Sequence, residues 1–402
     1  MNVRRSAAVL AATAVIGLAT PALAASPSPS VAIPSGLYGT TDPTYDGVWR
    51  QSLALLAQYR SDVTPAEKAV DWLLGQQCAN GAFAAFRAEP AKDCDAKLMV
   101  DTNSTAAAAQ ALSLAGDGDH RKDAVKAVTW LKSVQNKDGG WGYTPGGASD
   151  ANSTAIVVGA LSAVGEDPET VVKDGRSPYD ALRGLALSCE DGGAFAYQPD
   201  KKGELAANAD ATAAAVVGMK GLSMVSAKAA GDTDLTCATA EDSDPDRSAA
   251  NGASYLAGAM AKDGHLMSVL PGAEDQPDFG NTADAVVALA VTGGPKATQK
   301  PLAWLEENSA DWAKQSGPAA YAQLILAARA AGADPRDFGG TDLVRELNAT
   351  GPKPQTQTKA ASEDGKKAEE DGVSVWWIIG VGAVAGIGVG FLISGRNKGK
   401  RQ

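Results

Sequence analysis

Histidine, aromatic residues and positive charge are all scarce in this chain of 402 residues. There are two histidines, and Phe, Trp and Tyr together make up 5% of the sequence. Because His120 and His265 stand in unrelated contexts, histidine-based acid–base and metal chemistry is limited, and no metal site is expected. Lys and Arg number 36 against 47 Asp and Glu, which gives a net charge of −11. Such a surface repels nucleic acid, so none is expected as a partner.

Cysteine is also rare, with four residues and no CxxC spacing, which argues against a zinc site. An even number of cysteines in an exported protein predicts two disulfides, formed by Cys78, Cys94, Cys189 and Cys237. Three pairings are possible. The local pairing, Cys78 with Cys94 and Cys189 with Cys237, is favoured because each bridge then closes a loop between neighbouring helices.

The N-terminus has the features of a secretory signal peptide over residues 1–24. Arg4 and Arg5 precede a short apolar run, and small residues stand before a cleavage point after Ala24. Residues 25–45 are predicted to be an exposed N-terminal segment. The mature chain is therefore expected outside the cytoplasm.

The C-terminus predicts a membrane anchor. Residues 373–393 are uncharged and long enough to cross a bilayer, and the basic tail 394–402 is expected in the cytoplasm. Residues 349–372 are rich in Pro, Gln, Lys and Glu and are predicted to be a disordered stalk. The four-residue spacing of Gly382, Gly386 and Gly390 would allow a homodimer through the anchor. With an Ala-rich composition typical of bacteria, these features predict a single-pass cell-membrane protein whose body is extracytoplasmic.

The body of the chain repeats itself. Four segments, which begin at Ala69, Ala127, Ala181 and Ala253, have apolar residues at helical spacing and end in a glycine-bearing turn. The turn is followed by Phe83, Trp141, Phe195 or Leu266. Lys, Glu and Asp on one face of these helices predict an outer layer.

A second helix follows each turn, beginning near Asp101, Asp150, Asn208 and Asn281. These residue types can cap a helix N-terminus. The helices are rich in Ala and Val on all sides, which predicts burial all round in an inner layer. Flanking helices are expected at 46–60, 64–77, 298–314, 317–332 and 341–348, and the acidic stretch 226–247 is expected to be a solvated loop. The predicted fold is all-α: an α6/α6 toroid over 46–348, two concentric rings of helices, plus one C-terminal transmembrane helix.

The repeat resembles the prenyltransferase and squalene-cyclase superfamily. Gln135 to Trp141 matches its QxxxGxW motif in full, Gln77 to Phe83 matches it with Phe for Trp, and Cys189 to Phe195 keeps only the Gly and the aromatic position. The resemblance covers roughly residues 46–348 and implies an α/α toroid. The motif residues are structural in that superfamily and tie the outer helix to the next turn, so Gln135 and Trp141 are given no chemistry.

The catalytic sets of the superfamily are incomplete in this chain. Squalene-type cyclases protonate their substrate with the middle Asp of a DxDD motif, and the nearest text, Asn208 to Ala213, keeps only Asp210. The zinc ligands of protein prenyltransferases and the GCGEQ sequence of thioester proteins are missing. Sugar-cleaving toroids use two carboxylates or a Tyr/His pair, and none stands out, so that alternative stays open. No enzymatic activity is expected on these grounds.

Another branch of the superfamily, the transcobalamin and intrinsic factor cobalamin carriers, offers a second resemblance. Val100-Asp101-Thr102 and the Ala-rich helix that follows look like the carrier segment whose Asp and Thr contact the corrin amides. The resemblance implies ligand contacts for Asp101 and Thr102. Internal symmetry extends the predicted ligand-binding set to Asp101, Thr102, Asp150, Asn152, Asn208, Asp210, Asn281 and Asp284. The carriers' small β-domain has no counterpart here, because the stalk follows the toroid directly, and this weakens the case for tight cobalamin capture.

Three functions follow from these observations. The first is a non-enzymatic, membrane-anchored receptor that binds a small molecule, such as a corrinoid, and passes it to a membrane importer subunit. The second is an enzyme, either a degenerate terpenoid cyclase or a polysaccharide-active toroid. The third is a scaffold of the cell envelope whose acidic surface binds a protein partner. No cofactor is expected apart from a corrinoid as ligand.

Overall fold

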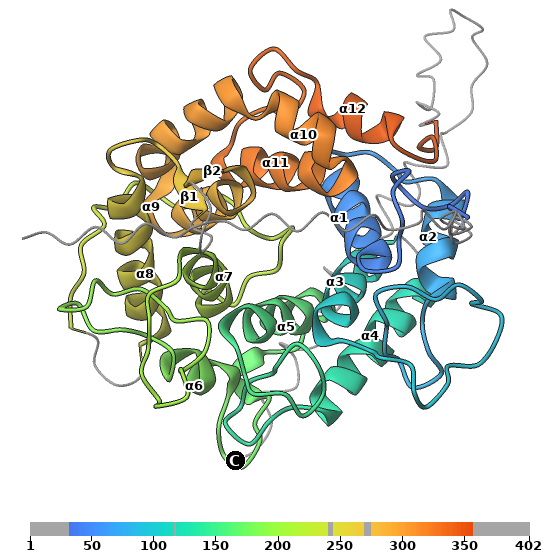
Figure 1. The fold of residues 1–402 in the computed structure, drawn as a ribbon, viewed down its shortest axis with the longest axis horizontal. Helices are drawn as coiled ribbons and strands as arrows, with labels where there is room; N and C mark the ends of the chain where they lie inside the picture. The colour runs from blue at the N-terminus through green and yellow to red at the C-terminus, as the bar shows by residue number, and fades with distance from the viewer. Residues whose placement is uncertain (1–31, 116–117, 240–243, 269–274, 357–402) are drawn as a thin grey trace, which may run out of the picture. The chain divides into compact units, whose positions relative to one another are not determined.

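The computed structural model describes residues 32–115, 118–239, 244–268 and 275–356, which are mainly helical, as predicted (Figure 1). Their one sheet is a short antiparallel hairpin of β1 (Leu266–Ser268) and β2 (Gln276–Asp278), which the sequence did not predict. In this part of the chain no helix has both the length and the apolar character needed to cross a membrane. The predicted signal peptide 1–24, the transmembrane helix 373–393, the tail 394–402 and the stalk from residue 357 onward lie outside the described residues.

Six helices pack side by side around a common centre (Figure 1). Each contacts the next in the series, and the last packs on the first. These inner helices are α1 (Gly47–Arg60), α3 (Thr102–Ser113), α5 (Ala151–Val164), α7 (Ala209–Met219), the first half of α9 (Phe279–Asn308) and α11 (Pro318–Ala331).

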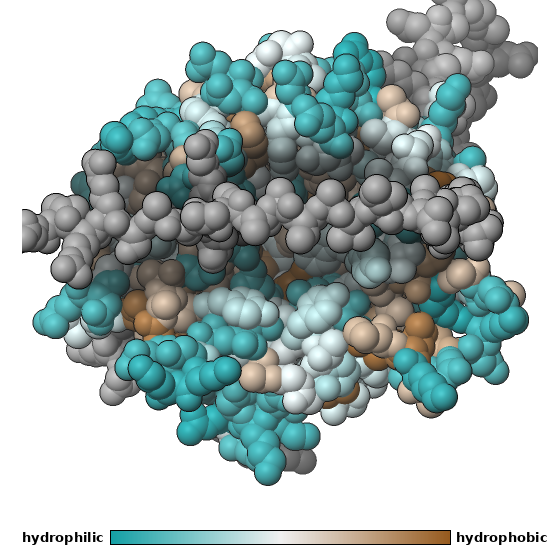
Figure 2. Space-filling model, in the orientation of Figure 1, coloured by the Kyte–Doolittle hydropathy of each residue, from teal (hydrophilic) through white to brown (hydrophobic). Residues whose placement is uncertain are grey.

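Shorter or more polar helices pack on the outside of this ring. They are α2 (Glu67–Gly75), α4 (Gly118–Ser133), α6 (Pro178–Arg183), α8 (Pro245–Met260), the second half of α9, α10 (Ala310–Ser316) and α12 (Leu343–Ala349), with a 3₁₀ turn, η1 (Pro168–Thr170), before α6. Figure 2 shows one face of the molecule, whose periphery is largely hydrophilic.

Two outer elements differ from the sequence prediction. Helix α6 ends at Arg183 because the backbone then turns to pair with the next segment, and the Leu187 and Ala196 N–H groups donate to Ala194 and Leu185. The predicted helix 298–314 is instead the second half of α9 followed by α10. Helix α9 breaks at Gly294, whose φ of 71° and the Pro that follows stop the inner half from continuing straight.

Small side chains allow the inner helices to lie close together. Ala106, Ala107, Ala108 and Ala109 of α3 are all fully buried, although they cover every side of the helix. A helix that is buried all round cannot carry charged residues on any face, and Ala leaves room for neighbours on both sides. The Ala-rich composition therefore places these segments in the inner layer, as predicted.

The QxxxGxW turn has the structural role that the resemblance implied. The Gln135 side-chain amide donates to the carbonyl oxygens of Gly139 at 2.8 Å and Val171 at 3.1 Å. Trp141 is almost completely buried, and its indole N–H donates to the Leu131 carbonyl oxygen at 2.7 Å. The turn thus ties the end of α4 to the segment that enters α5.

A threonine in four of the six inner helices holds the preceding turn, a contact that the sequence did not predict. The backbone N–H of Phe83 donates to Thr105 Oγ1, that of Trp141 to Thr154 Oγ1 and that of Phe195 to Thr212 Oγ1, at 2.9, 3.1 and 2.9 Å. The fourth copy joins Leu266 to Thr282 at 3.0 Å. These contacts set the four inner helices in the same register relative to their turns.

Both predicted disulfides are present with the local pairing. Cys78 is bonded to Cys94, and Cys189 to Cys237. Sixteen residues separate the first pair and 48 the second. A bridge that closes a longer loop removes more conformational entropy from the unfolded chain, so the second is expected to stabilise the fold more.

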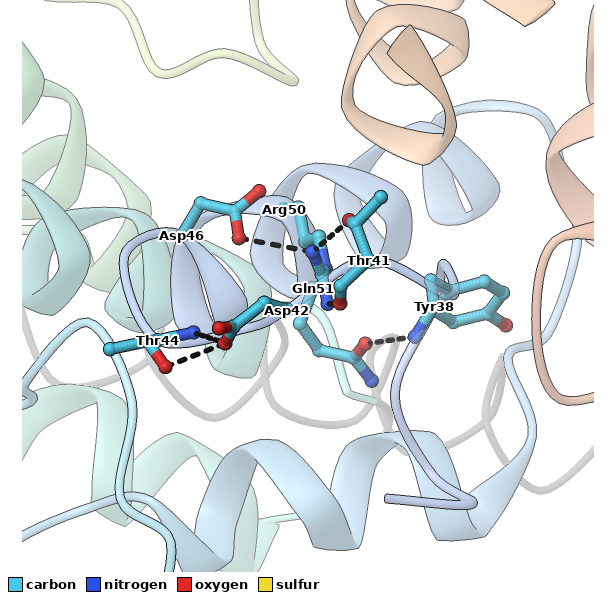
Figure 3. Close-up of polar contacts among 7 residues, drawn as sticks. All are labelled: Tyr38, Thr41, Asp42, Thr44, Asp46, Arg50 and Gln51. Carbon is cyan, nitrogen blue, oxygen red and sulfur yellow. Dashed lines mark hydrogen bonds and ion pairs between the residues drawn. The ribbon is translucent and has the colours of Figure 1, made fainter. Parts of the chain in front are cut away.

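The segment before α1 is exposed at many of its described residues, as predicted, but Gly36 to Gly39 are buried. Tyr38 is fully buried, and its backbone N–H donates to Gln51 Oε1 at 2.9 Å (Figure 3). Arg50, also buried, donates to Thr41 Oγ1 at 2.8 Å and pairs with Asp46 at 3.0 Å. The Tyr38 ring is apolar enough to leave water once its hydroxyl has partners. The hydroxyl lies within hydrogen-bond distance of two acceptors, Gln58 Oε1 and the Pro352 carbonyl oxygen. The first residues of the predicted stalk are therefore packed as well.

The predicted solvated loop 226–247 is exposed over most of its described residues, but it is also tied to the ring. We call residues 221–238 the floor segment, because they cross the C-terminal ends of the inner helices. The Met224 N–H donates to Gln110 Oε1 of α3 at 2.9 Å, Arg60 of α1 donates to the Ala227 carbonyl oxygen, and the Ala230 N–H donates to Ala290 of α9 at 2.8 Å. Its acidic part is exposed, while Leu222 and Met224, which precede residue 226, pack against the inner helices.

Candidate functional site

A cavity of about 260 Å³ lies among the inner helices. All six of them contribute to its wall, and the floor segment adds Leu222 and Met224. Most of the lining is apolar, and six polar side chains face it: Asn103, Gln110, Asn152, Asp210, Asp284 and Gln323. A mainly apolar pocket with a few convergent polar groups is the usual form of a small-molecule site.

The lining residues recur at helical spacing from the N-caps. Asn103, Asn152 and Asp210 each stand two residues after the capping residue of α3, α5 and α7. Ile156 of α5 and Ala214 of α7 also line the cavity, six residues after the caps of their helices. Each of these two helices has further lining residues about one turn deeper on the same face. Since the turns hold these helices in the same register, the first three residues form one polar layer at the N-terminal end of the ring.

Asp210 lies in the first turn of α7, where the helix dipole favours a negative charge. Asn152 Nδ2 of α5 donates to Asp210 Oδ2 at 2.8 Å. Burial raises the pKa of the Asp210 carboxyl above its usual value, the Asn152 hydrogen bond lowers it, and the nearby charge of Asp278 raises it again. The net effect is a raised pKa for Asp210.

Asp284 lies one turn deeper, on α9. Burial raises its pKa to about 7, and the charges of Asp210 and Asp278 add to that rise. The side-chain amide of Gln323 on α11 donates to Asp284 Oδ2 at 3.3 Å and acts in the opposite direction. The cavity thus holds two neighbouring carboxyl groups, and Asp284 is the one that retains a proton near neutral pH.

The rest of the wall is apolar. Trp49 and Leu53 of α1, Val217 of α7, Val287 of α9 and Leu326 of α11 line it. The polar side chain of Gln110 is occupied, because it donates to the Ile156 carbonyl oxygen and accepts from the Met224 N–H. The deep end of the cavity therefore offers a ligand almost only apolar contacts.

The structure separates the predicted ligand-binding residues into two groups. Asn152, Asp210 and Asp284 line the cavity. The other five, Asp101, Thr102, Asp150, Asn208 and Asn281, are not among its lining residues.

Helix capping accounts for most of the second group. The side chains of Asp101, Asp150 and Asn208 accept from the N–H groups of Ser104, Ser153 and Ala211, three residues on. The first two are buried, and burial raises the pKa of both carboxyl groups. Thr102 is buried behind the Tyr143 turn, to which its N–H donates.

Asn281 was predicted as a site residue because its repeat was aligned in the wrong register. The cap of α9 is Asp278, whose carboxylate accepts from both the backbone N–H and the side-chain amide of Asn281. Thr282 marks the true alignment, since it holds its turn as Thr212 does four residues after Asn208. The sequence contained this signal, but the helix-start residues were aligned by type instead.

Besides the aliphatic lining and Gly159, the sequence prediction missed one aromatic and three polar cavity residues: Trp49, Asn103, Gln110 and Gln323. Asn103 and Asn152 occupy equivalent repeat positions, so the symmetry that gave Asn152 could have given Asn103. Gln323 had no repeat signal, because its helix lies outside the four clear copies. In the described residues no three His, Cys, Asp or Glu side chains are grouped so as to hold a metal ion.

Comparison with known proteins relates part of the ring to terpenoid cyclases. Residues 48–167 match the family model of the squalene-hopene cyclase C-terminal domain. The drimenyl diphosphate synthase of Streptantibioticus cattleyicolor is 41% identical over 78 residues, 19% of this chain and 13% of that protein. The squalene–hopene cyclase of Alicyclobacillus acidocaldarius is 30% identical over 138 residues, 32% of this chain and 22% of that protein. The chain thus spans less than a quarter of the length of either relative.

Two solved structures are also similar, at 15% sequence identity. The match with the ent-copalyl diphosphate synthase from Streptomyces platensis covers 71% of this chain and 50% of the synthase chain, with a TM-score of 0.45. The match with a sugar epimerase from a ruminal bacterium covers 68% of this chain and 80% of the epimerase chain, also with a TM-score of 0.45. At these TM-scores the two likenesses carry no inference about function.

The sequence matches support the resemblance to the squalene-cyclase repeat superfamily, while a relation to the cobalamin carriers is not shown. They also overturn the expectation that the chain has no enzymatic activity, because the matching relatives are a synthase and a cyclase. That expectation came from the incomplete DxDD text. The DxDD text of α7 keeps only Asp210, but the cavity has a second carboxyl group, which Asp284 of α9 supplies.

Proposed function

We propose that the chain is an α6/α6 toroid of the terpenoid-cyclase type that rearranges a neutral prenyl chain by protonating one of its double bonds. The observation that carries this proposal is the pair of carboxyl groups, Asp210 and Asp284, in one mainly apolar cavity. Asp210 stands where the middle acid of a DxDD motif would be. The names of the matching relatives support the same class of chemistry.

Asp284 is the proton donor in this proposal. Its O–H bond breaks while a C–H bond forms at one alkene carbon, which leaves a carbocation on the other. The electron pair of a second double bond then forms a ring-closing C–C bond, and loss of a neighbouring proton to the Asp284 carboxylate restores the acid. The product is an isomer of the substrate, so no oxidant or co-reactant is needed. A donor with a pKa near 7 is about half protonated at neutral pH and mostly protonated below it.

Asp210 and Trp49 stabilise the positive charge that develops. Asp210 is held by Asn152 at the N-terminal end of α7, where it remains the more easily ionised of the two acids. The π-face of an indole attracts cations, and Trp49 lines the same cavity. Fixed charge and dipoles in a site with little water are worth more than the same groups in solution.

The test is turnover of neutral prenyl compounds by the full-length chain in detergent. Farnesol, farnesene and geraniol are incubated with the protein, and isomers of unchanged mass are sought by gas chromatography and mass spectrometry. Asp284→Asn should lower the rate by about a hundredfold or more, because the amide cannot donate a proton in the same way. The wild-type rate should fall as pH rises through about 7, where Asp284 loses its proton.

A matched control separates this effect from a general loss of fold. Asp71 is exposed on α2, far from the cavity lining, so Asp71→Asn should leave the rate unchanged. Equal rates for Asp284→Asn and wild type, or no isomer from any of the three compounds, would contradict the proposed reaction.

Capture of a corrinoid has less support. Drug-sized ligands need pockets of about 300–1,000 Å³, and a corrinoid is larger still, so a cavity of about 260 Å³ does not favour corrinoid capture. Export and tethering to a bacterial membrane remain our proposal from residues 1–24 and 373–393. The two disulfides support an oxidising compartment, as expected for an exported protein.

A further inference from the structure

The wall of the cavity carries charge of one sign. Its two acidic residues are Asp210 and Asp284, and none of its lining residues is Lys, Arg or His. Asp278, which caps α9, adds a third acid close enough to raise the pKa of both. A ligand that enters this end of the cavity therefore meets a negative field that no cation of the lining offsets.

This field disfavours an anionic head group. A diphosphate carries several negative charges, and the Asp210 carboxylate, with Asp278 close by, would repel it, because like charges interact more in a low dielectric. Proteins usually bind phosphates with Arg, Lys or backbone N–H groups, and the first two are missing from this lining. The diphosphates in the names of two similar proteins are thus poor models for the ligand here.

The polar layer instead offers hydrogen-bond acceptors. Asn152 uses one of the two Asp210 carboxylate oxygens, which leaves the other to the cavity. Asn103 Oδ1 and Asn152 Oδ1 are buried without a hydrogen-bond partner. A buried acceptor without a donor costs free energy, and a small rotation of either amide would let it accept from a donor on the ligand.

The acceptors and the apolar surface lie at opposite ends. Asp210 stands two residues after its cap, 208, while Asp284 stands six after its cap, 278. The four-residue difference corresponds to a depth of about 6 Å along the ring. Beyond Asp284 come Val217, Val287 and the floor residues Leu222 and Met224.

From this arrangement we infer that the substrate is a short, neutral prenyl alcohol, with its hydroxyl at the Asn103–Asn152–Asp210 layer and its tail toward the floor segment. The inference rests on the proposed function in that it assigns the substrate of the same cavity. The hydroxyl donates to Asp210, and the double bond nearest the head comes level with Asp284. A plain hydrocarbon fills the same apolar space but leaves the acceptors without a donor.

Binding of three probes with the same tail tests the inference without turnover. Farnesol, farnesene and farnesyl diphosphate differ mainly in the head, and equilibrium dialysis against the full-length chain in detergent measures the affinity of each. Farnesol should bind about tenfold to a hundredfold more tightly than either of the others, as expected for one hydrogen bond to a charged acceptor. Diphosphate binding equal to or tighter than farnesol binding would overturn the inference.

A variant of the acceptor layer sharpens the test. Asp210→Leu should reduce farnesol affinity to that of farnesene, while farnesene affinity stays the same or rises. Asp71→Leu, which removes an exposed carboxylate of α2, should change none of the three. If Asp210→Leu weakens all three probes equally, the hydroxyl contact is wrong.

The outcomes distinguish this inference from the proposed reaction. If farnesene is isomerised by wild type but not by Asp284→Asn, and farnesol binds no better than farnesene, then the reaction stands and the alcohol preference fails. If farnesol binds with the expected preference and is never converted, then the head-group assignment stands and the reaction fails.

Discussion

Replacing Asp284 with asparagine should make the protein more stable than wild type at pH 8 and about equally stable at pH 4. The folded pKa of Asp284 is raised to about 7 from an ordinary value of 3.8. Between these values the folded chain keeps a proton that the unfolded chain has lost, so the free energy of unfolding falls as pH rises. The slope is about 1.4 kcal/mol per pH unit, which gives a loss on the order of 2–4 kcal/mol by pH 8. Asparagine, which does not titrate, avoids this loss.

Denaturant unfolding from pH 4 to pH 8 measures the effect. The difference between Asp284→Asn and wild type should grow steadily with pH and level off above about 7. Asp71→Asn on the exposed face of α2 serves as the control and should stay within about 0.5 kcal/mol of wild type at every pH. A difference that does not change with pH would show that Asp284 is not held in its protonated form.

The second large effect is expected at the QxxxGxW turn. Trp141→Ala should destabilise the fold by about 3–5 kcal/mol, because a buried indole is replaced by a cavity. The substitution also leaves the Leu131 carbonyl oxygen without its donor. Trp141→Phe should cost much less, about 1–2 kcal/mol, since Phe83 and Phe195 fill the equivalent position in two other repeats.

Thermal or denaturant unfolding again gives the measurement. Tyr143, two residues farther along the same turn, is 47% exposed, and Tyr143→Ala should cost less than about 1 kcal/mol. If Trp141→Ala and Tyr143→Ala had the same small effect, the turn would not be the structural joint between the outer and inner helices that its contacts indicate.

Much of the helical plan could be predicted because it depends on local patterns. Ala-rich segments that follow an Asp or Asn cap predicted buried inner helices, and Asp101 and Asp150 do cap α3 and α5. The glycine-bearing turns and the disulfide pairing also followed from spacing along the chain. Each of these features involves neighbours in sequence, for which residue type and period carry the information.

The site was harder to predict because it depends on which helices face one another. Asp284 was included through a faulty alignment that placed the start of its helix at Asn281 instead of Asp278. Its partner Gln323 comes from a helix with no clear repeat. Leu222 and Met224 close the cavity from the segment that follows α7, and no local pattern showed that this segment crosses the ring.

The central claim is that a carboxylic acid inside the ring keeps its proton until the pH rises to about 7. Infrared difference spectroscopy of the full-length chain against Asp284→Asn, recorded as a pH titration, measures this most directly. The account predicts a protonated carboxyl band that is absent from the variant and disappears in wild type with a midpoint of about 7. A midpoint near 3.8, the ordinary value for Asp, would contradict it.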